Sequence, residues 1–440
     1  MLLIVLDTLR ADCIGKQYGE QAVMPFLTDF AGKSVYFTRA VSPSNWTKPA
    51  MASVFTSLYP GVHGVHYGAR QGVADDPTSD VLGEQAQTLA EYLRESGYQT
   101  KAVQTNANLT AELGFAQGFE EFEFKIGANA RAVTDATLAQ LAQARSPFLL
   151  YAHYFDPHFT YEPPAEFRAL FPDAGSLPAS DQKLLSPKNV ADFYWDTIRT
   201  TLKLQPAPRL PRLSDAGRDH LHRLYDAEVR FMDSQVQRLV ETVLKEHPNT
   251  LVVVLSDHGE EFWEHGGMGH GTTMFEELLC VPLLLHGPGL QAVRIDKRVE
   301  ALNLLPTVAA YLKRERSPAW QGVDLLRADT PSQPAFVRSK GFWITLQVDL
   351  ECVIEGDRKL VLDHTHNTAS LYDLQRDPAE QQDITGDAPA EVEKLKVLLE
   401  QHRASNSAHP QAQGTTAPVP LSDEEREHLR ALGYLGGDGK

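Results

Sequence analysis

Residues 250–258 read T-L-V-V-V-L-S-D-H, and this stretch decides the fold class. A short, continuous apolar run bounded by polar residues is typical of a strand that is buried on both faces of a parallel sheet. We therefore predict a strand over residues 250–255, with Asp257 and His258 just beyond its carboxyl end.

Similar apolar runs occur on both sides of this stretch. The further predicted strands span residues 2–6, 35–40, 101–104, 148–152 and 281–285. Between them, residues 215–245 carry apolar side chains at a helical period that is held for several turns. Strands that alternate with helices are typical of βαβ units. The sequence therefore predicts an α/β fold with a mainly parallel sheet flanked by helices.

The sequence pattern changes near residue 331, which predicts two units. Residues 1–330 form the predicted catalytic domain, in which the segment 167–212, rich in Pro and Ser, is expected to be an insertion near the substrate entrance. In the rest of the chain, short alternating segments occur at residues 343–348, 350–355 and 359–363. A helical segment follows at 390–403, then a polar linker at 404–420 and a last helix at 423–432. We expect residues 331–440 to form a small α+β subdomain with an antiparallel sheet, followed by a tail.

Side chains that can bind a metal follow three of the predicted strands. Asp7 follows the first, His153 and His158 follow the strand over 148–152, and Asp257 and His258 follow the strand that ends at residue 255. Ligands bind at the carboxyl ends of strands in open α/β sheets, so we expect these side chains to converge. Carboxylate and imidazole ligands suit Zn²⁺, Mn²⁺ or Ca²⁺, and a histidine ligand favours a transition metal because Ca²⁺ prefers oxygen.

Thr47 is the candidate nucleophile, in the stretch S-P-S-N-W-T-K-P-A-M at residues 42–51. We expect Pro49 at the first position of a helix, which would place the Thr47 hydroxyl just before the helix start. Unpaired backbone N–H groups and the positive end of the helix dipole favour an anion there. Metal coordination would lower the pKa of the hydroxyl further. Taken alone, Thr47 is more simply interpreted as a helix cap.

Five motifs in this order resemble those of the sulfatases. They are I-V-L-D-T-L-R-A-D at 4–12, W-T-K-P-A-M-A-S-V-F-T-S-L-Y-P-G-V-H-G at 46–64, H-Y-F-D-P-H-F-T-Y at 153–161, S-D-H-G-E at 256–260 and G-H-G-T-T-M-F-E-E at 269–277. In addition, S-L-Y-D-L-Q-R-D-P-A-E-Q at 370–381 resembles the C-terminal subdomain of the family. The resemblance covers nearly the whole chain, and it implies an alkaline-phosphatase-like fold and hydrolysis of a sulfate or phosphate ester.

The resemblance also implies roles for individual residues. The implied metal ligands are Asp7, Thr47, Asp257 and His258, the catalytic residues are Thr47, His158 and His270, and the candidate substrate contacts are Lys48, Asn106 and His153. His158 matches a position that contacts the anion or protonates the leaving group. His270 lies at or near a position where many members carry an anion-binding lysine. Arg10 is a further candidate for supporting the site.

The nucleophile motif departs from that of most sulfatases, which oxidise a cysteine or serine to formylglycine. Thr47 cannot form this aldehyde because its β-carbon bears a methyl group. Met51 replaces the motif arginine, and Asn106 replaces a lysine. Thr8 and His258 also replace oxygen ligands of the metal.

A threonine nucleophile occurs in the related phosphoethanolamine transferases, where it is transiently phosphorylated. Three hypotheses therefore remain: a sulfate-ester hydrolase, a phosphodiesterase or phosphoryl transferase with a phosphothreonine intermediate, and a binding protein without activity. In the second case, His158, His270 and His153 could hold a second metal.

Composition limits the partners and the compartment. The formal net charge of −17 over 440 residues argues against a nucleic-acid partner. The resemblance to the sulfatases implies a small-molecule, saccharide or lipid ester as the substrate. No apolar run is long enough to span a membrane, and the run over 2–6 is too short for an export signal. As written, the chain is expected to be cytoplasmic; a longer N-terminus carrying a leader would make it periplasmic or secreted.

Overall fold

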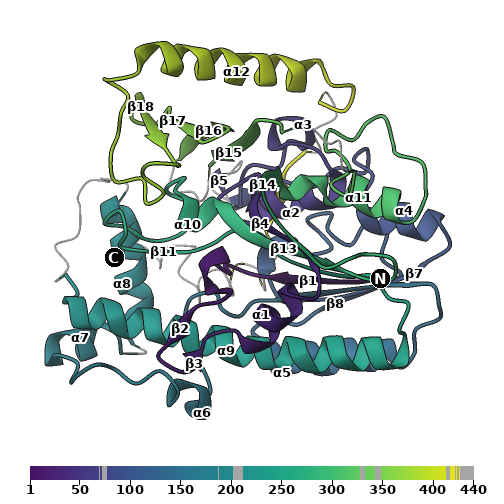
Figure 1. The fold of residues 1–440 in the computed structure, drawn as a ribbon, viewed down its shortest axis with the longest axis horizontal. Helices are drawn as coiled ribbons and strands as arrows, with labels where there is room; N and C mark the ends of the chain where they lie inside the picture. The colour runs from purple at the N-terminus through teal and green to yellow at the C-terminus, as the bar shows by residue number, and fades with distance from the viewer. Residues whose placement is uncertain are drawn as a thin grey trace.

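The computed structural model describes residues 1–68, 70–71, 77–186, 188–201, 212–327, 332–341, 348–412, 417–421, 423 and 426. A central eight-stranded sheet has the order β14-β4-β13-β10-β1-β9-β7-β8 (Figure 1). Its strands are β1 (Leu2–Leu6), β4 (Val35–Val41), β7 (Gln99–Gln104), β8 (Glu121–Phe124), β9 (Phe148–Tyr154), β10 (Val252–Ser256), β13 (Cys280–His286) and β14 (Val293–Glu300). β13 is antiparallel to both neighbours, and the other pairs are parallel. The prediction of a mainly parallel sheet is therefore confirmed.

The side chains of β1 alternate between two apolar cores. Leu2, Ile4 and Leu6 pack in the core beneath α5 (Ala130–Leu141) and α9 (Asp215–Glu246). Leu3 and Val5 pack in the core beneath α2 (Thr47–Thr56), α4 (Leu89–Glu95) and α11 (Leu304–Tyr311). Figure 1 shows these two groups of helices on opposite faces of the sheet. Because both faces of β1 are covered, every position of this strand is apolar.

Shorter elements surround the central sheet. The helices are α1 (Pro25–Ala31), α3 (Pro60–His63), α6 (Ala165–Arg168), α7 (Ala179–Leu184), α8 (Val190–Thr201) and α10 (Glu276–Leu279), with 3₁₀ turns at Ala11–Cys13, Ala107–Leu109 and Ala301–Asn303. The short strands are β2 (Gln17–Tyr18), β3 (Gln21–Ala22), β5 (Arg70–Gln71), β6 (Pro77–Ser79), β11 (Glu261–Phe262), β12 (Met268–Gly269) and β19 (Val419–Pro420). The segment 167–212 contains α7 and α8, and its residues 187 and 202–211 lie outside the described part of the chain.

A second, antiparallel sheet lies in the C-terminal part of the chain. Its strands follow one another as β15 (Ala335–Lys340), β16 (Asp349–Glu355), β17 (Arg358–Asp363) and β18 (Thr368–Asp373). The helix α12 (Pro389–Ala408) packs on this sheet through Val392, Leu395 and Leu399 (Figure 1). The small antiparallel sheet with a packed helix is as predicted. The predicted boundary near 331, nearly all of the segment 343–348 and most of the final helix lie outside the described residues.

Candidate active site

The carboxyl ends of three adjacent strands bring the candidate metal ligands together. Leu6 at the end of β1 pairs with Ser256 of β10 on one side and with Tyr154 of β9 on the other. The residues that follow or precede these positions therefore lie at one level of the sheet. Ligand atoms of Asp7, His153 and Asp257 all lie within 4.8 Å of one another, and all three side chains are buried. The convergence predicted from the sequence is thus present.

Thr47 joins this group from the start of α2. Its Oγ1 lies 3.2 Å from Nε2 of His258 and 3.5 Å from Oδ1 of Asp7. Our placement of Pro49 at the first helical position is wrong, because the helix begins at Thr47 itself. Pro49 is tolerated at the third position since the first N–H groups of a helix have no intrahelical partner. The hydroxyl group nonetheless lies at the positive end of the helix.

Asn106 also belongs to the cluster. Its amide nitrogen donates to Oδ2 of Asp7 at 2.6 Å and lies 3.3 Å from Oγ1 of Thr47. The residue caps the 3₁₀ turn that follows β7, where its Oδ1 accepts from the backbone N–H of Asn108. Both ends of the amide are therefore fixed, and the side chain orients the candidate nucleophile and one carboxylate at the same time.

Hydrogen bonding assigns different roles to the two imidazoles beside Asp7. Nδ1 of His258 lies 2.9 Å from the carbonyl oxygen of Gly259, which only accepts, so Nδ1 carries the proton. Nε2 of His258 then presents its lone pair to Thr47 and to the carboxylate of Asp257, 3.4 Å away. Burial lowers the pKa of His258, which keeps this lone pair available. His258 is therefore well arranged to bind a metal.

His153 has the opposite arrangement. Its Nε2 lies 3.1 Å from Oδ2 of Asp7, and its Nδ1 lies 2.7 Å from the hydroxyl oxygen of Tyr151. A carboxylate only accepts, so a neutral His153 donates through Nε2 and accepts through Nδ1 from Tyr151. Although His153 lies within the ligand-distance group, this tautomer makes it a support for Asp7 rather than a metal ligand.

The two carboxylates of the cluster require a cation or a proton. Burial raises the pKa of Asp257 to about 7, and the charge of Asp7 acts in the same direction. For Asp7, the hydrogen bond from His153 and the neighbouring imidazoles outweigh burial and hold its pKa below the usual range. Among the described residues, Oδ2 of Asp257 is buried without a hydrogen-bond partner. This orphaned oxygen, beside a second carboxylate and an imidazole lone pair, fits a divalent metal of the Zn²⁺ or Mn²⁺ type.

Two further imidazoles border the cluster. The ring of His270 lies 4.5 Å from that of His258 and 5.0 Å from that of His158, centre to centre. Nδ1 of His158 lies 2.6 Å from the carbonyl oxygen of Phe159, and Nδ1 of His270 lies 2.9 Å from Oε1 of Glu260. Burial lowers the pKa of His270 to about 4 and raises that of Glu260 to about 7. An ester anion beside His270 would oppose this effect of burial and favour the imidazolium ion.

Sequence reasoning missed the supporting residues Glu260, Tyr151 and Tyr161. Glu260 stands in the quoted motif S-D-H-G-E, and the hydroxyl of Tyr161 donates to its Oε2 at 3.3 Å. Tyr151 precedes His153 by two positions on β9, and this spacing puts both side chains on one face of the strand. The period of a strand could therefore have identified Tyr151, whereas the contact of Tyr161 depends on tertiary structure.

Two other candidates have partners outside the cluster. The ammonium group of Lys48 donates to Oγ of Ser79 and to the carbonyl oxygen of Tyr67, 3.3 Å away. Arg10 forms an ion pair with Asp12 at 2.7 Å and donates to the carbonyl oxygen of Glu260 at 3.0 Å. Arg10 thus holds the backbone of the loop that carries His258.

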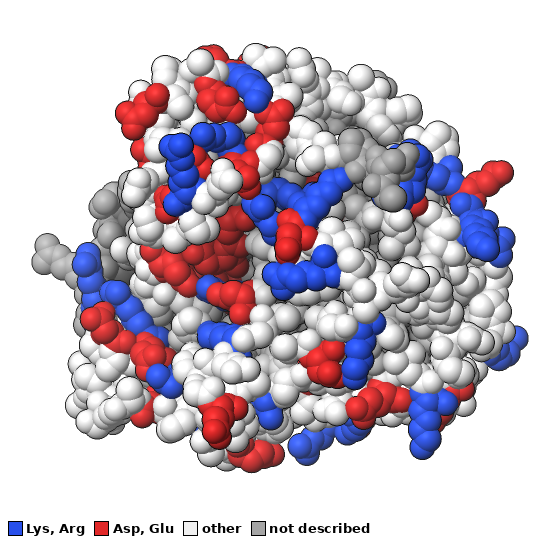
Figure 2. Space-filling model, in the orientation of Figure 1, with Lys and Arg blue, Asp and Glu red and all other residues white. Residues whose placement is uncertain are grey.

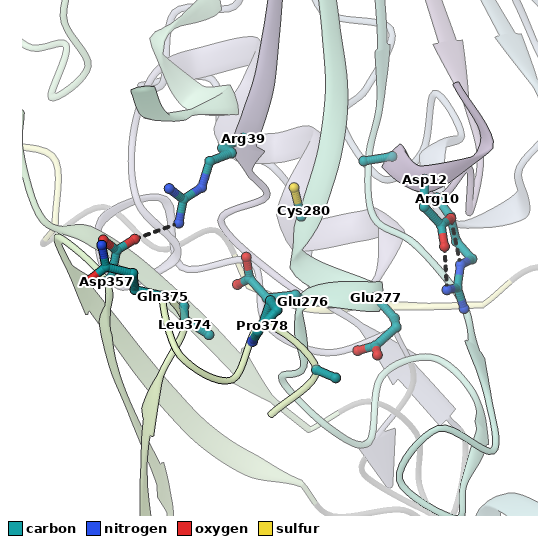
Figure 3. A pocket seen from close by; sticks show the side chains of 12 residues that line it. Arg10, Asp12, Arg39, Glu276, Glu277, Cys280, Asp357, Leu374, Gln375 and Pro378 are labelled. Atoms are coloured by element: carbon teal, nitrogen blue, oxygen red, sulfur yellow. Dashed lines mark hydrogen bonds and ion pairs between the residues drawn. The ribbon is translucent and has the colours of Figure 1, made fainter. Parts of the chain in front are cut away.

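A large cavity is present away from the residues of the cluster. It measures about 640 Å³ and is lined by residues near the central sheet, such as Arg39 and Glu276, and by residues of the C-terminal part, such as Asp357 and Leu374. Figure 2 shows a hollow with acidic side chains over α10, and Figure 3 shows Glu276 and Glu277 between the Arg10–Asp12 and Arg39–Asp357 pairs. The candidate nucleophile and metal ligands do not line this cavity. Cavity size alone therefore does not locate the chemistry.

With this geometry in place, comparison with known proteins defines the family. The family model described as Sulfatase matches residues 1–313. The chain belongs to the sulfatase family. This confirms the predicted family and the prediction of a sulfatase-type hydrolytic enzyme. Among the described residues, none of the helices has both the length and the apolarity needed to cross a membrane.

Relatives in the family are distant but span most of the chain. The uncharacterized sulfatase YidJ of Escherichia coli (strain K12) is 24% identical over 437 residues, which cover 88% of this chain and 83% of the relative. The delta 4,5-hexuronate-2-O-sulfatase of Bacteroides thetaiotaomicron is 23% identical, with coverage of 92% and 87%. The phosphonate monoester hydrolase of Silicibacter pomeroyi has a similar structure, with a TM-score of 0.72 at 20% identity and coverage of 93% and 96%. The structural likeness supports the fold alone.

Proposed function

We propose that this sulfatase-family protein is a metal-dependent hydrolase that cleaves sulfate esters with Thr47 as its nucleophile. The observation that carries the proposal is the position of the Thr47 hydroxyl. It lies at the start of α2, 3.2 Å from Nε2 of His258 and 3.5 Å from Oδ1 of Asp7. A hydroxyl group held there is suited to attack an anionic ester that the helix N-terminus attracts.

Asp7, Asp257 and His258 would hold the metal, together with Thr47. When bound, the metal would act as a Lewis acid that lowers the pKa of the hydroxyl and stabilises negative charge on the ester oxygens. Asn106 fixes the orientation of Thr47 through the amide contact at 3.3 Å. His153 holds Asp7 through Nε2, so the carboxylate keeps one position during turnover.

The chemical steps follow from these contacts. Oγ1 of Thr47 attacks the sulfur atom in line with the ester oxygen, and its proton passes to the carboxylate of Asp257, which hydrogen-bonds with the Thr47 hydroxyl and whose pKa burial raises to about 7. As the Oγ1–S bond forms, the ester S–O bond breaks and the leaving oxygen takes a proton from His158 or His270. His270 is the proposed donor because its Nδ1 lies 2.9 Å from Oε1 of Glu260, and the carboxylate of Glu260 would stabilise the imidazolium ion that a bound ester anion favours. Water then hydrolyses the sulfated threonine and restores the hydroxyl.

The proposed substrate class is a sulfated saccharide. The similarity to a hexuronate-2-O-sulfatase over 92% of this chain supports it. A phosphodiester or phosphonate ester is the second candidate. Two features favour this candidate: Thr47 cannot form the formylglycine aldehyde, and a structurally similar protein hydrolyses phosphonate monoesters.

The test compares kcat/KM for an aryl sulfate and an aryl phosphodiester, with Mn²⁺, Zn²⁺ or Ca²⁺ added to the purified protein. Preference for the sulfate supports the first candidate, and preference for the phosphodiester supports the second. Thr47→Ala should abolish turnover, whereas Thr47→Ser keeps a hydroxyl group and should retain part of it. Mass spectrometry of rapidly quenched enzyme should find the transferred group on Thr47: a sulfate group with the sulfate ester, or the phosphorus-containing group with the phosphodiester. Full turnover by metal-loaded Thr47→Ala enzyme would overturn the role of Thr47.

A further inference from the structure

A second, smaller pocket lies between α3 and the C-terminal sheet, with a volume of about 220 Å³. Among the described residues that line it, Arg338, Lys340 and Arg403 are cationic and Glu351 is the one acid. His66 also lines this pocket. In a chain with a net charge of −17, such a local excess of positive charge is a separate feature that attracts anions at short range. We call this cavity the basic pocket.

The acids near the basic pocket only partly neutralise it. Glu351 is shared, since it lies 2.5 Å from Nη1 of Arg403 and 3.6 Å from Nη1 of Arg338. Asp349 pairs with Arg338 at 2.5 Å and lies 4.0 Å from Nζ of Lys340. Burial, together with the nearby Arg338 and Lys340, lowers the pKa of His66 to about 4 against the opposing charge of Asp80. The imidazole is therefore neutral at pH 7, and Arg338, Lys340 and Arg403 supply the charge.

The walls of the basic pocket are attached to the segment that carries the nucleophile. The backbone N–H of Arg338 donates to the carbonyl oxygen of Pro43 at 3.0 Å, four residues before Thr47. On the other wall, Lys48 donates to the carbonyl oxygen of Tyr67, the neighbour of His66. Peptide and side-chain lengths along this second path place His66 within about 20 Å of Thr47. A short oligosaccharide can span this distance.

The floor of the basic pocket is aromatic and rigid. The ring of His402 stacks on Phe336 with centres 3.9 Å apart, and Tyr59 meets His402 edge-on at 4.4 Å. A hydrogen bond from Nδ2 of Asn406 to Nε2 of His402, 2.9 Å long, fixes the imidazole. Small-molecule sites combine an apolar surface of this kind with a few charged groups that set orientation. Guanidinium and ammonium groups select carboxylate or sulfate as the complementary group.

We infer that the basic pocket is a subsite that binds a second anionic group, a carboxylate or sulfate, on the same saccharide whose ester lies at Thr47. This inference rests on the proposed function, since it names the part of the substrate that lies away from the reacting ester. The positive charge comes from Arg338, Lys340 and Arg403. The aromatic floor of Phe336 and His402 limits the pocket to a small anionic group.

The test uses a sulfated disaccharide that carries a uronate carboxylate and its carboxyl-reduced, neutral counterpart. Wild-type enzyme should favour the acidic substrate in kcat/KM, mainly through a lower KM, and salt should reduce the preference. The double variant Lys340→Gln/Arg403→Gln should lower the ratio of the two kcat/KM values by at least about tenfold, because the loss of even one charge-assisted contact has an effect of this size. The control variant Lys394→Gln/Lys396→Gln removes the same charge from α12 outside the pocket and should keep the wild-type ratio.

A second measurement separates this inference from the proposed function. The unsulfated acidic disaccharide is titrated into wild-type enzyme and both double variants by calorimetry, so that no ester cleavage is needed. Weaker binding by the pocket variant alone supports the subsite even if the enzyme cleaves no sulfate ester. Equal binding by all three proteins, or a wild-type enzyme that does not distinguish the acidic from the neutral disaccharide, would overturn it. Thermal melting confirms that each variant is folded.

Discussion

The hydroxyl oxygen of Tyr151 lies 2.7 Å from Nδ1 of His153 on the same face of β9. Both side chains are buried, and Nε2 of His153 continues the chain of hydrogen bonds to Asp7. The carboxylate of Asp7 requires the proton on Nε2 of His153, and the tyrosine hydroxyl supports this tautomer by donating to Nδ1. A residue outside the proposed metal-ligand set can in this way control the orientation of Asp7, the proposed ligand.

Tyr151→Phe removes this hydroxyl and should weaken metal binding about 10- to 100-fold, the range found when a partner of a metal ligand is lost. The metal dissociation constant, measured by competition with a chelator, is the readout. Tyr154→Phe is the matched control, because its hydroxyl lies on the same strand and contacts Thr134 instead. Equal metal affinity in the wild type and Tyr151→Phe would show that the Tyr151 hydroxyl is not needed to orient His153.

His258→Asn should change which metal the site prefers. Nε2 of His258 presents a lone pair toward the carboxylate of Asp257, and imidazole favours transition metals over Ca²⁺. An amide oxygen in its place should shift the ratio of Zn²⁺ to Ca²⁺ affinities toward Ca²⁺ by at least about tenfold. Calorimetric titration with each metal gives this ratio. An unchanged ratio would mean that His258 lies outside the coordination sphere.

Much of this site could be predicted from sequence because strand ends have a fixed geometry. Asp7, Asp257 and His258 follow continuous apolar runs, and parallel strands bring such residues to one edge of the sheet. That β1 and β10 are neighbours, so that these side chains meet, is seen only in the structure. The role of Asn106 as an amide that bridges Asp7 and Thr47 could not be deduced, because it depends on how β7 lies beside β9.

In the fold, too, some elements could be predicted from the sequence and others could not. β1 and β10 were evident as uniformly apolar runs, but β14 (Val293–Glu300) was missed. This strand lies at the edge of the sheet and exposes much of its polar sequence V-R-I-D-K-R-V-E, so it lacks the apolar pattern of a buried strand. The hydrogen bond from Lys48, a candidate substrate contact, to Ser79 likewise could not be predicted, because it depends on packing against a segment that is distant in the sequence.

Glu260→Gln should reduce kcat most for esters with poor leaving groups. The carboxylate accepts from Nδ1 of His270 at 2.9 Å, and an amide would stabilise the imidazolium ion less well. General acid catalysis contributes about 10²- to 10⁴-fold, so kcat for an alkyl ester should fall by about 100-fold and that for a nitroaryl ester by much less. Glu261→Gln is the neighbouring control, since its carboxylate instead contacts Thr273 and the backbone of Gly267. Equal losses for both leaving groups would exclude His270 as the acid.

Glu300→Gln should alter how stability depends on pH. The buried carboxyl group of Glu300 accepts from the backbone of Phe336 and from Tyr59, and burial raises its pKa from 4.5 to about 7. The folded protein therefore holds this proton more tightly than the unfolded chain does. Its contribution to stability is fully present below pH 4.5 and is lost as pH rises through about 7.

Wild type should therefore lose up to about 3 kcal/mol of unfolding free energy between pH 4.5 and 8, relative to a variant without this ionisation. Because Gln keeps the acceptor oxygen, Glu300→Gln should match the wild type at pH 5 and exceed it in stability at pH 8. Urea unfolding at both pH values measures the difference, with the exposed Glu95→Gln on α4 as the control. Parallel pH profiles for the wild type and Glu300→Gln would show that Glu300 is already ionised in the folded protein at pH 5. The contact between β14 and the C-terminal sheet would then contain a buried charge rather than a neutral acid.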